Sequence, residues 1–400
     1  MVGYNKRLVK MKNTKKIIYL LTIASLVQII FGHHAILPTY LKVILGGCDM
    51  IALFYAIEDL DKWGGKTYIK NMLFMMIAYI SVLLIRAMLS PQLSYTTYLF
   101  SPFYTFAAAV PLFTIMVGPN FRLRPFVVCC ALAMLANVLW FRNVGLSYFI
   151  IALFFPYLKN VKWYLVIIIF ALAVDLMYAL DLLGYNENPR SYIVEGVCCV
   201  ALIFFVWFRN SEKMSKYAQY VLFTLGVAVV YGFLSGKYSF FEIMSQESSN
   251  EKMALDTRSL LYYEVFDNMR TLDDWLFGKG IGGGYVSDYF GTTVSNARGT
   301  VEVNVLNTFL HGGLVLLLIH LTIMITAVFN CFKKANNRFC RACGFIVSIF
   351  FFNVFIVDYP SRISLVQIIP WICCGFCLSD YWLSKSDSEI NKIIVNQIKL

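Results

Sequence analysis

The longest apolar run of the chain is VNVLNTFLHGGLVLLLIHLTIMITAVFNC, at residues 303–331. About 20 helical residues cross the hydrocarbon core of a bilayer, so this run is long enough to span a membrane. In lipid, backbone polar groups must be satisfied within the spanning segment itself, which a helix achieves. The run therefore predicts a membrane-spanning α-helix.

Eleven further apolar runs share this character and lie at 17–37, 41–57, 71–90, 97–118, 125–141, 143–158, 162–184, 190–208, 217–235, 338–357 and 362–383. The chain of 400 residues is 59% hydrophobic and only 14% charged, a composition that excludes an ordinary water-soluble domain. The sequence therefore predicts an all-α, polytopic integral membrane protein with about 12 transmembrane helices.

The formal net charge of +11 is spread unevenly over the connections between these runs. If the N-terminus is cytoplasmic, 23 Lys and Arg residues fall in inner connections and tails. The short outer connections hold only Lys42, Arg142, Arg190 and Arg362. Because positive charge resists translocation, this asymmetry predicts that both termini are cytoplasmic. Membrane orientation thus explains the basic charge, and no nucleic acid partner is expected.

One hydrophilic segment interrupts the apolar runs and defines the domain organisation. The predicted parts are a basic cytoplasmic tail at 1–16, nine transmembrane helices within 17–235, a large loop at 236–302, three helices within 303–383 and a cytoplasmic tail at 384–400. Since the loop follows the ninth span, it is expected on the external or periplasmic side. The chemistry of the protein is expected on that side.

Apolar residues recur at spacings of three and four through residues 254–277 of the loop. This pattern predicts one amphipathic helix lying along the membrane surface. The helix would present Arg258 and, one turn on, Tyr262, with Arg270 further along. The alternative is a solvated face whose arginines meet lipid head groups.

The sequence GKGIGGGY at 278–285 contains the spacing GxGxxG. A dinucleotide site is excluded because that fingerprint needs a preceding strand, whereas a predicted helix precedes it here. The glycines instead predict a sharp turn whose backbone amides, together with Lys279, can approach an anion.

Eleven cysteines include two CxxC pairs, Cys340/Cys343 and Cys374/Cys377. The second pair lies inside an apolar run, where cysteine serves as a small apolar residue. We therefore expect no metal site, and the absence of cysteine from the loop predicts no disulfide framework.

Several charged residues within the predicted spans lie toward their outer ends, at Arg86, Asp181, Arg190 and Glu195, whereas Asp49 and His320 lie nearer mid-span and stay unassigned. Each charge in a bilayer is costly and tends to face a partner or a cavity. Individually they could be snorkelling or paired residues. Collectively they suggest a polar cavity that opens outward.

Two motifs bordering the polar part of the loop carry a resemblance to a known family. An Arg-bearing helix leads into WLFGKG at 275–280, and a polar stretch leads into EVNVLNTFLHGGL at 302–314. With the topology, these motifs make the chain similar to the O-antigen polymerase and ligase family, which are polytopic bacterial glycosyltransferases of the GT-C type. Ligases of that family typically show a histidine where this chain has Glu302, and an acidic residue where it has His311.

The resemblance implies a Wzy-type polymerase of the bacterial cytoplasmic membrane. Such an enzyme joins undecaprenyl-pyrophosphate-linked oligosaccharide repeat units into a surface polysaccharide, O-antigen or capsule, without metal or other cofactor. Its donor and acceptor are lipid-linked, and a chain-length regulator and a flippase of the same pathway are expected partners. Guanidinium groups can bind the pyrophosphate oxygens, and a general base can take the proton of the acceptor hydroxyl. The expected catalytic residues are Glu302 or His311, and the expected substrate-binding residues are Arg258, Arg270, Arg86, Lys279, Tyr262 and Arg298.

Other interpretations of these residues stay open. Glu302 would also be favourable simply at the positive end of a helix, and His311 could pack against glycine. The chain could also be an O-antigen ligase of the same family, or a non-enzymatic lipid-linked oligosaccharide flippase or transporter. A flippase does not need a large external loop, and a secondary transporter more typically shows repeated halves and broken helices.

Overall fold

The computed structural model describes residues 13, 16–20, 39–60, 63, 66–89, 107–117, 121, 153, 200–208, 212–234, 257–281, 283–288, 297–355 and 365–398. The predicted spans at 125–141 and 162–184 lie outside the described residues, as does all of 143–158 except Leu153. The charged residues Asp181, Arg190 and Glu195 lie outside them as well.

The described part of the chain is mostly helical, which confirms the predicted helical fold in its coarse form. The elements are α2 (Thr39–Leu60), α3 (Thr67–Leu89), the 3₁₀ helix η1 (Ala107–Met116), the π-helix η3 (Ile203–Phe208), α9 (Glu212–Leu234), α11 (Thr257–Asn268), α12 (Leu272–Phe277), β1 (Tyr285–Val286), β2 (Ala297–Arg298), α13 (Asn304–Lys334), α14 (Arg338–Asn353), α15 (Leu365–Leu378), α16 (Asp380–Leu383) and α17 (Asp387–Ile398). The strands β1 and β2 form one short antiparallel ladder that the all-α prediction did not include.

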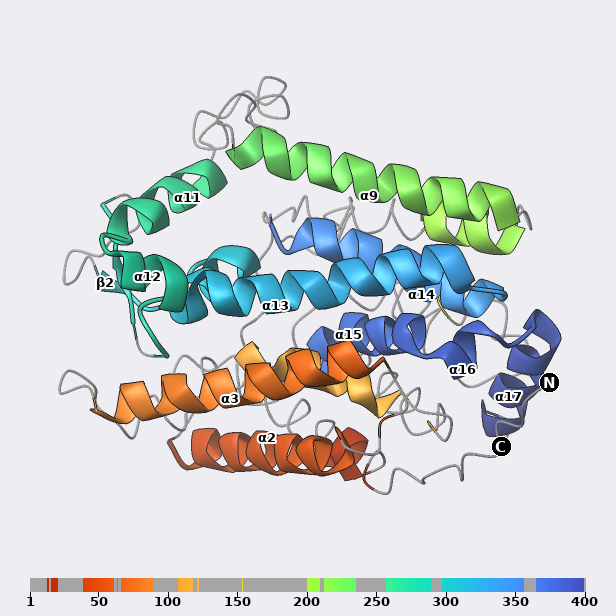
Figure 1. The fold of residues 1–400 in the computed structure, drawn as a ribbon, viewed down its shortest axis with the longest axis horizontal. Coiled ribbons are helices and arrows are strands. Elements are labelled where there is room, and N and C mark those ends of the chain that lie inside the picture. Colours follow the sequence, from red (N-terminus) through yellow and green to blue (C-terminus); the bar gives the residue numbers. More distant parts are fainter. Residues whose placement is uncertain are drawn as a thin grey trace, which may run out of the picture.

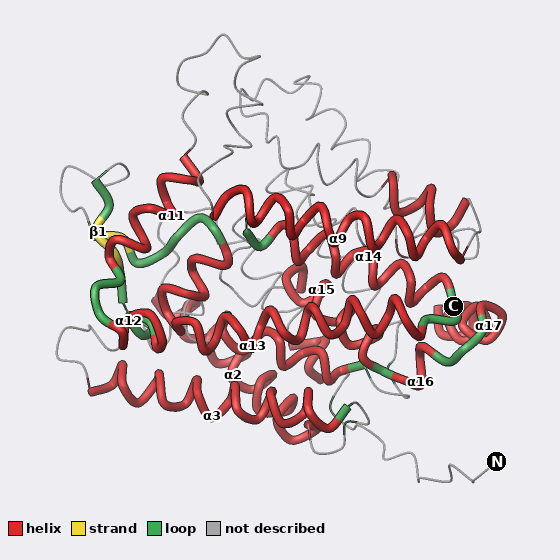
Figure 2. Tube along the Cα trace, turned by 45° about the horizontal axis from the view of Figure 1, so that its top comes forward, coloured by secondary structure: helices red, strands yellow, loops and turns green. Residues whose placement is uncertain are grey.

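The long helices run side by side along the longest axis, and the shorter elements gather at its two ends (Figure 1). One end carries α11, α12 and β2, and the other carries α16 and α17 (Figure 1). The same grouping persists in the rotated view, where β1 lies beside α11 and α12 (Figure 2). We call the end with α11, α12 and β2 the loop end, because it contains the described part of residues 236–302. We call the end with α16 and α17 the basic end, because Lys334 and Arg338 lie there.

Two of the described helices are long and apolar enough to cross a membrane, by length and composition, at Thr67–Ala87 and Asn304–Lys334. Helix α3 exposes large apolar side chains, including Met75, Val82 and Ile85. Helix α15 is shorter than the predicted run at 362–383, because Ser379 interrupts the helix before α16 begins.

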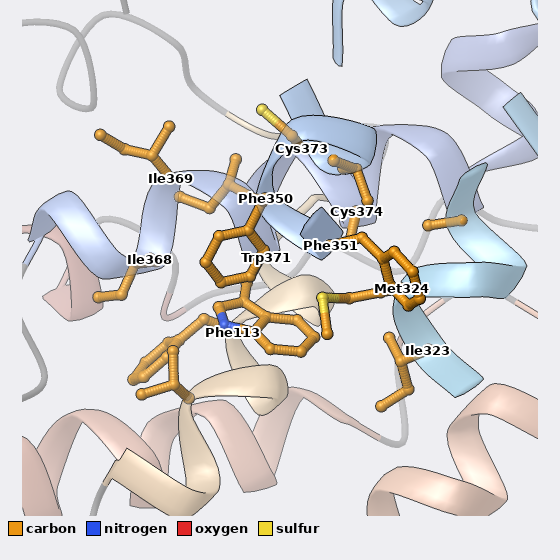
Figure 3. Close-up of a cluster of buried hydrophobic side chains, with 14 of the residues drawn as sticks. Phe113, Ile323, Met324, Phe350, Phe351, Ile368, Ile369, Trp371, Cys373 and Cys374 are labelled. Carbon is orange, nitrogen blue, oxygen red and sulfur yellow. The ribbon is translucent and has the colours of Figure 1, made fainter. Parts of the chain in front are cut away.

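Aromatic and aliphatic side chains from η1, α13, α14 and α15 form the centre of the packing (Figure 3). The indole of Trp371 meets the ring of Phe350 edge-on, with the ring centroids 5.8 Å apart, and Phe113 and Met324 complete the cluster (Figure 3). Gly375 lets α15 approach η1 closely, since a Cβ there would meet the carbonyl oxygen of Thr114. These helices pack into the core that lies between the two ends.

Buried cysteines from three helices lie within this core, at Cys331 of α13, Cys340 and Cys343 of α14, and Cys374 and Cys377 of α15. The thiol of Cys331 donates to the carbonyl oxygen of Cys340 at 3.0 Å. Thiols in such surroundings pack as small apolar groups. In the part of the chain that the structure describes, no group of three or more His, Cys, Asp or Glu residues is arranged to hold a metal ion.

Candidate functional site

The loop end is built around a break in α13. Gly313 has φ 62° and ψ −168°, so the helix stops there and restarts, although the apolar run predicted one continuous span. The chain of α12 passes directly against this break, and a Cβ on Gly313 would meet the carbonyl oxygen of Leu276. Only glycine combines the positive φ with so close an approach.

The turn that follows α12 needs glycine for the same reason. Gly278 has φ 70°, and a Cβ there would lie 2.6 Å from the backbone nitrogen of Gly313 and 2.7 Å from the carbonyl carbon of His311. Gly278 of the WLFGKG motif is therefore packed backbone to backbone against the HGG motif. The motifs that the sequence analysis singled out separately form one structural unit.

Carbonyl groups around the break accept hydrogen bonds from residues elsewhere in the fold. The backbone N–H of Lys279 donates to Leu310 at 2.7 Å, and the hydroxyl of Tyr79 donates to Gly312 at 2.8 Å. Both carbonyls belong to the last turn before the break, where a helix leaves its acceptors unsatisfied. A break in an apolar helix is tolerated where neighbouring groups replace the lost hydrogen bonds, as they do here.

Helix α3 contributes a second donor to the same unit. Nη1 of Arg86 donates to the carbonyl oxygen of Gly278 at 3.2 Å, and the hydroxyl of Tyr79 also lies 3.3 Å from the carbonyl oxygen of Phe277. Tyr79 and Arg86 are seven residues apart, which places them on one face of the helix. Arg86 thus lies at the loop end, as its predicted depth required, and its guanidinium touches the turn.

The residues before the turn are ordered by a capping box. The Thr271 hydroxyl accepts from the backbone N–H of Asp274 at 3.1 Å, and the Asp274 carboxylate accepts from the backbone N–H of Thr271 at 3.2 Å. This N-terminus starts a separate helix, so the single amphipathic helix predicted over 254–277 is wrong. Residues Met269 and Arg270 lie between the two helices outside any regular structure.

Lys279 is paired with the same carboxylate, its Nζ lying 3.2 Å from Oδ2 of Asp274. Partial burial alone would raise the pKa of Asp274, but hydrogen bonds from Thr271 and Lys279 hold it below its ordinary value. The ammonium group keeps part of its surface in solvent. Lys279 therefore presents a cation whose position is fixed by Asp274.

A second ion pair lies just before the start of α13, where the loop ends. Nη2 of Arg298 lies 3.3 Å from Oε1 of Glu302, and the Arg298 backbone pairs with Tyr285 across the β1–β2 ladder. The Glu302 side chain is 58% exposed, against 24% for that of Arg298. Burial raises the pKa of the Tyr285 phenol, and the nearby Arg298 guanidinium opposes that rise. Glu302 is therefore a solvent-facing carboxylate held by a half-buried cation.

His311 occupies the interior of the same region. Its Nδ1 lies 3.0 Å from the carbonyl oxygen of Gly280, and the carbonyl of Gly299 also faces the ring. The side chain is buried. His311 thus joins the glycine turn to the end of β2 from within the first half of α13.

The β1 strand is fastened to α11 by two groups that the sequence analysis did not single out. The amide of Asn268 exchanges two hydrogen bonds with the backbone of Val286, both at 3.0 Å. The buried carboxylate of Glu264 accepts from the Ser287 hydroxyl and from the backbone N–H of Asp288, at 2.9 Å each. These contacts hold the ladder, and with it Arg298, at a fixed place over the bundle.

The remaining predicted residues belong to α11 and the linker after it. The hydroxyl of Tyr262 donates to the carbonyl oxygen of Phe355 at 2.7 Å, and burial raises the pKa of its phenol. Tyr262 therefore anchors α11 to the end of α14. Arg258 belongs to the first turn of α11, and Arg270 is exposed after its last turn.

The structure thus brings Arg86, Lys279, Arg298, Glu302 and His311 to one end of the molecule, around the turn and the break. Sequence reasoning missed Tyr79, although its spacing of seven from Arg86 was a signal for a shared helix face. It also missed Asp274, which the pattern Thr271-x-x-Asp274 marks as part of a capping box.

Comparisons with protein-family models, with curated proteins and with solved structures find no match to this chain.

Proposed function

We propose that this chain is a membrane glycosyltransferase that polymerises lipid-pyrophosphate-linked oligosaccharide units at the loop end. The observation that carries the proposal is the convergence of two cations and one exposed carboxylate on the glycine turn and the α13 break. Lys279 and Arg298 are the cations, and Glu302 is the carboxylate. This set matches the needs of glycosyl transfer from a pyrophosphate without a metal.

In the proposed reaction, the bond between the donor's anomeric carbon and its pyrophosphate oxygen breaks. A hydroxyl oxygen of the acceptor unit forms the new glycosidic bond, and its proton passes to a base. Undecaprenyl pyrophosphate leaves with the bonding electron pair, so negative charge grows on its oxygens. Cationic donors placed at that charge stabilise the transition state. Lys279 on the turn and Arg298 on β2 are the cations proposed for this role, and Arg86 of α3 touches the turn. Arg258 of α11 and Arg270 after it are further candidates.

The geometry favours Glu302 over His311 as the base. Glu302 is exposed and its carboxylate can reach an acceptor hydroxyl, whereas His311 is buried with Nδ1 directed at the Gly280 carbonyl. A general base must come within hydrogen-bond distance of the proton it takes. His311 is accordingly a residue that positions the turn, and Tyr262 and Tyr79 hold the surrounding backbone.

One feature favours the transporter alternative, since interrupted helices form substrate sites in secondary transporters. The break at Gly313 is such an interruption. Its carbonyls, however, already accept from Lys279 and Tyr79, and its backbone is covered by α12. A break that is filled by protein is better explained as a support for the turn than as a transport site.

The test uses a strain in which this chain is the sole polymerase and the polymer is resolved by gel electrophoresis. Glu302→Gln should abolish polymer at normal protein level, with lipid-linked units accumulating on the outer face. Asp267→Asn, an exposed acid on α11, is the matched control and should leave the polymer unchanged. Units stranded on the inner face would instead identify a flippase. Normal polymer in Glu302→Gln would refute Glu302 as the base, and normal polymer in His311→Gln as well would exclude both candidates.

A further inference from the structure

Arg341 is a buried cation at the basic end, and the described residues offer its guanidinium one backbone carbonyl and no carboxylate. It lies one turn inside α14 and is only 8% exposed. Its Nη1 donates to the carbonyl oxygen of Ala335 at 3.4 Å, and its Nε is buried without a hydrogen-bond acceptor among the described residues. A guanidinium has five N–H donors, and burying its charge is costly unless it is paired.

Three acidic side chains of α16 and α17, at the basic end, are engaged with other cations. Asp380 of α16 pairs with Lys334 at 2.9 Å, and two acids of α17 pair in the same way, Asp387 with Arg338 at 3.3 Å and Glu389 with Lys385 at 3.0 Å. Within the described ranges, none of these carboxylates forms an ion pair with Arg341. None of these three acids therefore compensates the charge of Arg341.

The position of the guanidinium limits what that anion can be. A helical side chain points back toward the N-terminus, so the Arg341 head group lies beside the turn 335–337 that joins α13 to α14. This turn follows a helix long enough to cross a membrane, and the exposed Lys333 and Lys334 precede it. A turn at the end of such a helix is expected at the depth of lipid head groups, and Lys333 adds a second positive charge beside it.

From these observations we infer that Arg341 is the centre of a binding site for a phosphate-bearing anion at the α13–α14 turn. The planar guanidinium fork matches two phosphate oxygens, and Nε, which has no acceptor among the described residues, is free to donate to one of them. The phosphate is that of an anionic lipid in the inner leaflet or a free phosphate. The inference is independent of the proposed transferase reaction, since it concerns the opposite end of the molecule.

The experiment measures the unfolding temperature of the purified full-length protein in neutral detergent. Phosphatidylglycerol, phosphatidylcholine, inorganic phosphate and chloride at equal ionic strength are added in separate arms. Phosphatidylglycerol should raise the unfolding temperature, and phosphatidylcholine and chloride should not. An equal rise with inorganic phosphate would identify a free-anion site, and a rise with phosphatidylglycerol alone would identify a lipid site.

Arg341→Gln should weaken the anion effect about tenfold or more, because charge-assisted hydrogen bonds to phosphate are lost. Arg341→Lys keeps the charge without the fork and should be intermediate. Arg338→Gln, which removes an arginine already paired with Asp387, is the matched control and should keep the full effect. The inference is overturned if no anion stabilises the wild type, or if Arg341→Gln responds as the wild type does. Without added anion, Arg341→Gln should be at least as stable as the wild type. A lower stability would show that the hydrogen bond from Arg341 to the Ala335 carbonyl stabilises the fold, and would contradict the inference.

Discussion

Replacing Gly278 by alanine tests whether the turn and the helix break form one unit. The new Cβ would lie 2.6 to 2.8 Å from three backbone atoms of residues 311–313, and φ would stay at 70°. Adopting a positive φ costs an alanine about 1–2 kcal/mol, and overpacking costs about 1–3 kcal/mol more. We expect Gly278→Ala to lower the free energy of unfolding by about 2–5 kcal/mol.

Gly280 supplies a matched control within the same turn. Its φ is 84°, but a Cβ there would meet nothing within 4 Å. Gly280→Ala should therefore carry the backbone strain alone, about 1–2 kcal/mol. The difference between the two variants isolates the contact with the α13 break, which we expect to be about 1–3 kcal/mol.

The assay is reversible unfolding of the purified full-length protein in mixed micelles with increasing denaturing detergent. Gly47→Ala in α2, where a Cβ would also meet nothing, controls for the substitution itself and should be neutral or slightly stabilising. If Gly278→Ala unfolds at the same detergent fraction as Gly280→Ala, the turn is not packed against the break. The unit described at the loop end would then be refuted.

Two further predictions concern side chains of the same unit. Tyr79→Phe removes the donor to the Gly312 carbonyl and should lower the free energy of unfolding by about 1–3 kcal/mol in the same assay, whereas Tyr263→Phe at an exposed position should change it little. Because the pKa of Asp274 is held below its ordinary value of 3.8, its carboxylate contributes stability above that pH and loses the contribution as the pH falls through the lower, folded-state pKa. The gap in unfolding free energy between wild type and Asp274→Asn should thus stay constant near neutral pH and close in strong acid, and a gap that widens there would contradict the pairing.

Much of the helical framework is predictable from the sequence, because apolar length alone defines it. The runs at 41–57, 71–90, 217–235 and 303–331 predict helices where α2, α3, α9 and α13 lie. The interruption at Gly313 escaped this reasoning, since the run stays apolar through the break. At the break, the backbone of Leu276 in α12 packs directly against Gly313. The spacing of apolar residues carries no information about such a contact.

The division between α11 and α12 was missed for a related reason. Leu261, Val265, Met269 and Leu272 keep a helical spacing across the gap, so the pattern predicts one helix. The capping box at Thr271 was the local signal that a new helix begins. Among the candidate residues, the charged ones were found because charge is conspicuous in an apolar chain. Tyr79 was not, because its acceptors are backbone carbonyls far away in the sequence.

The hydrogen bond between Tyr79 and Gly312 joins residues 233 positions apart. At a synthesis rate of about 5–20 residues per second, α3 emerges roughly 10–50 s before its acceptor exists. During that interval the phenol has to find a temporary partner in water, in lipid head groups or in the insertion machinery. The loop end is consequently completed late in biogenesis. A truncated chain that ends before the HGG motif lacks the Gly312 carbonyl, so Tyr79 of α3 cannot form this hydrogen bond.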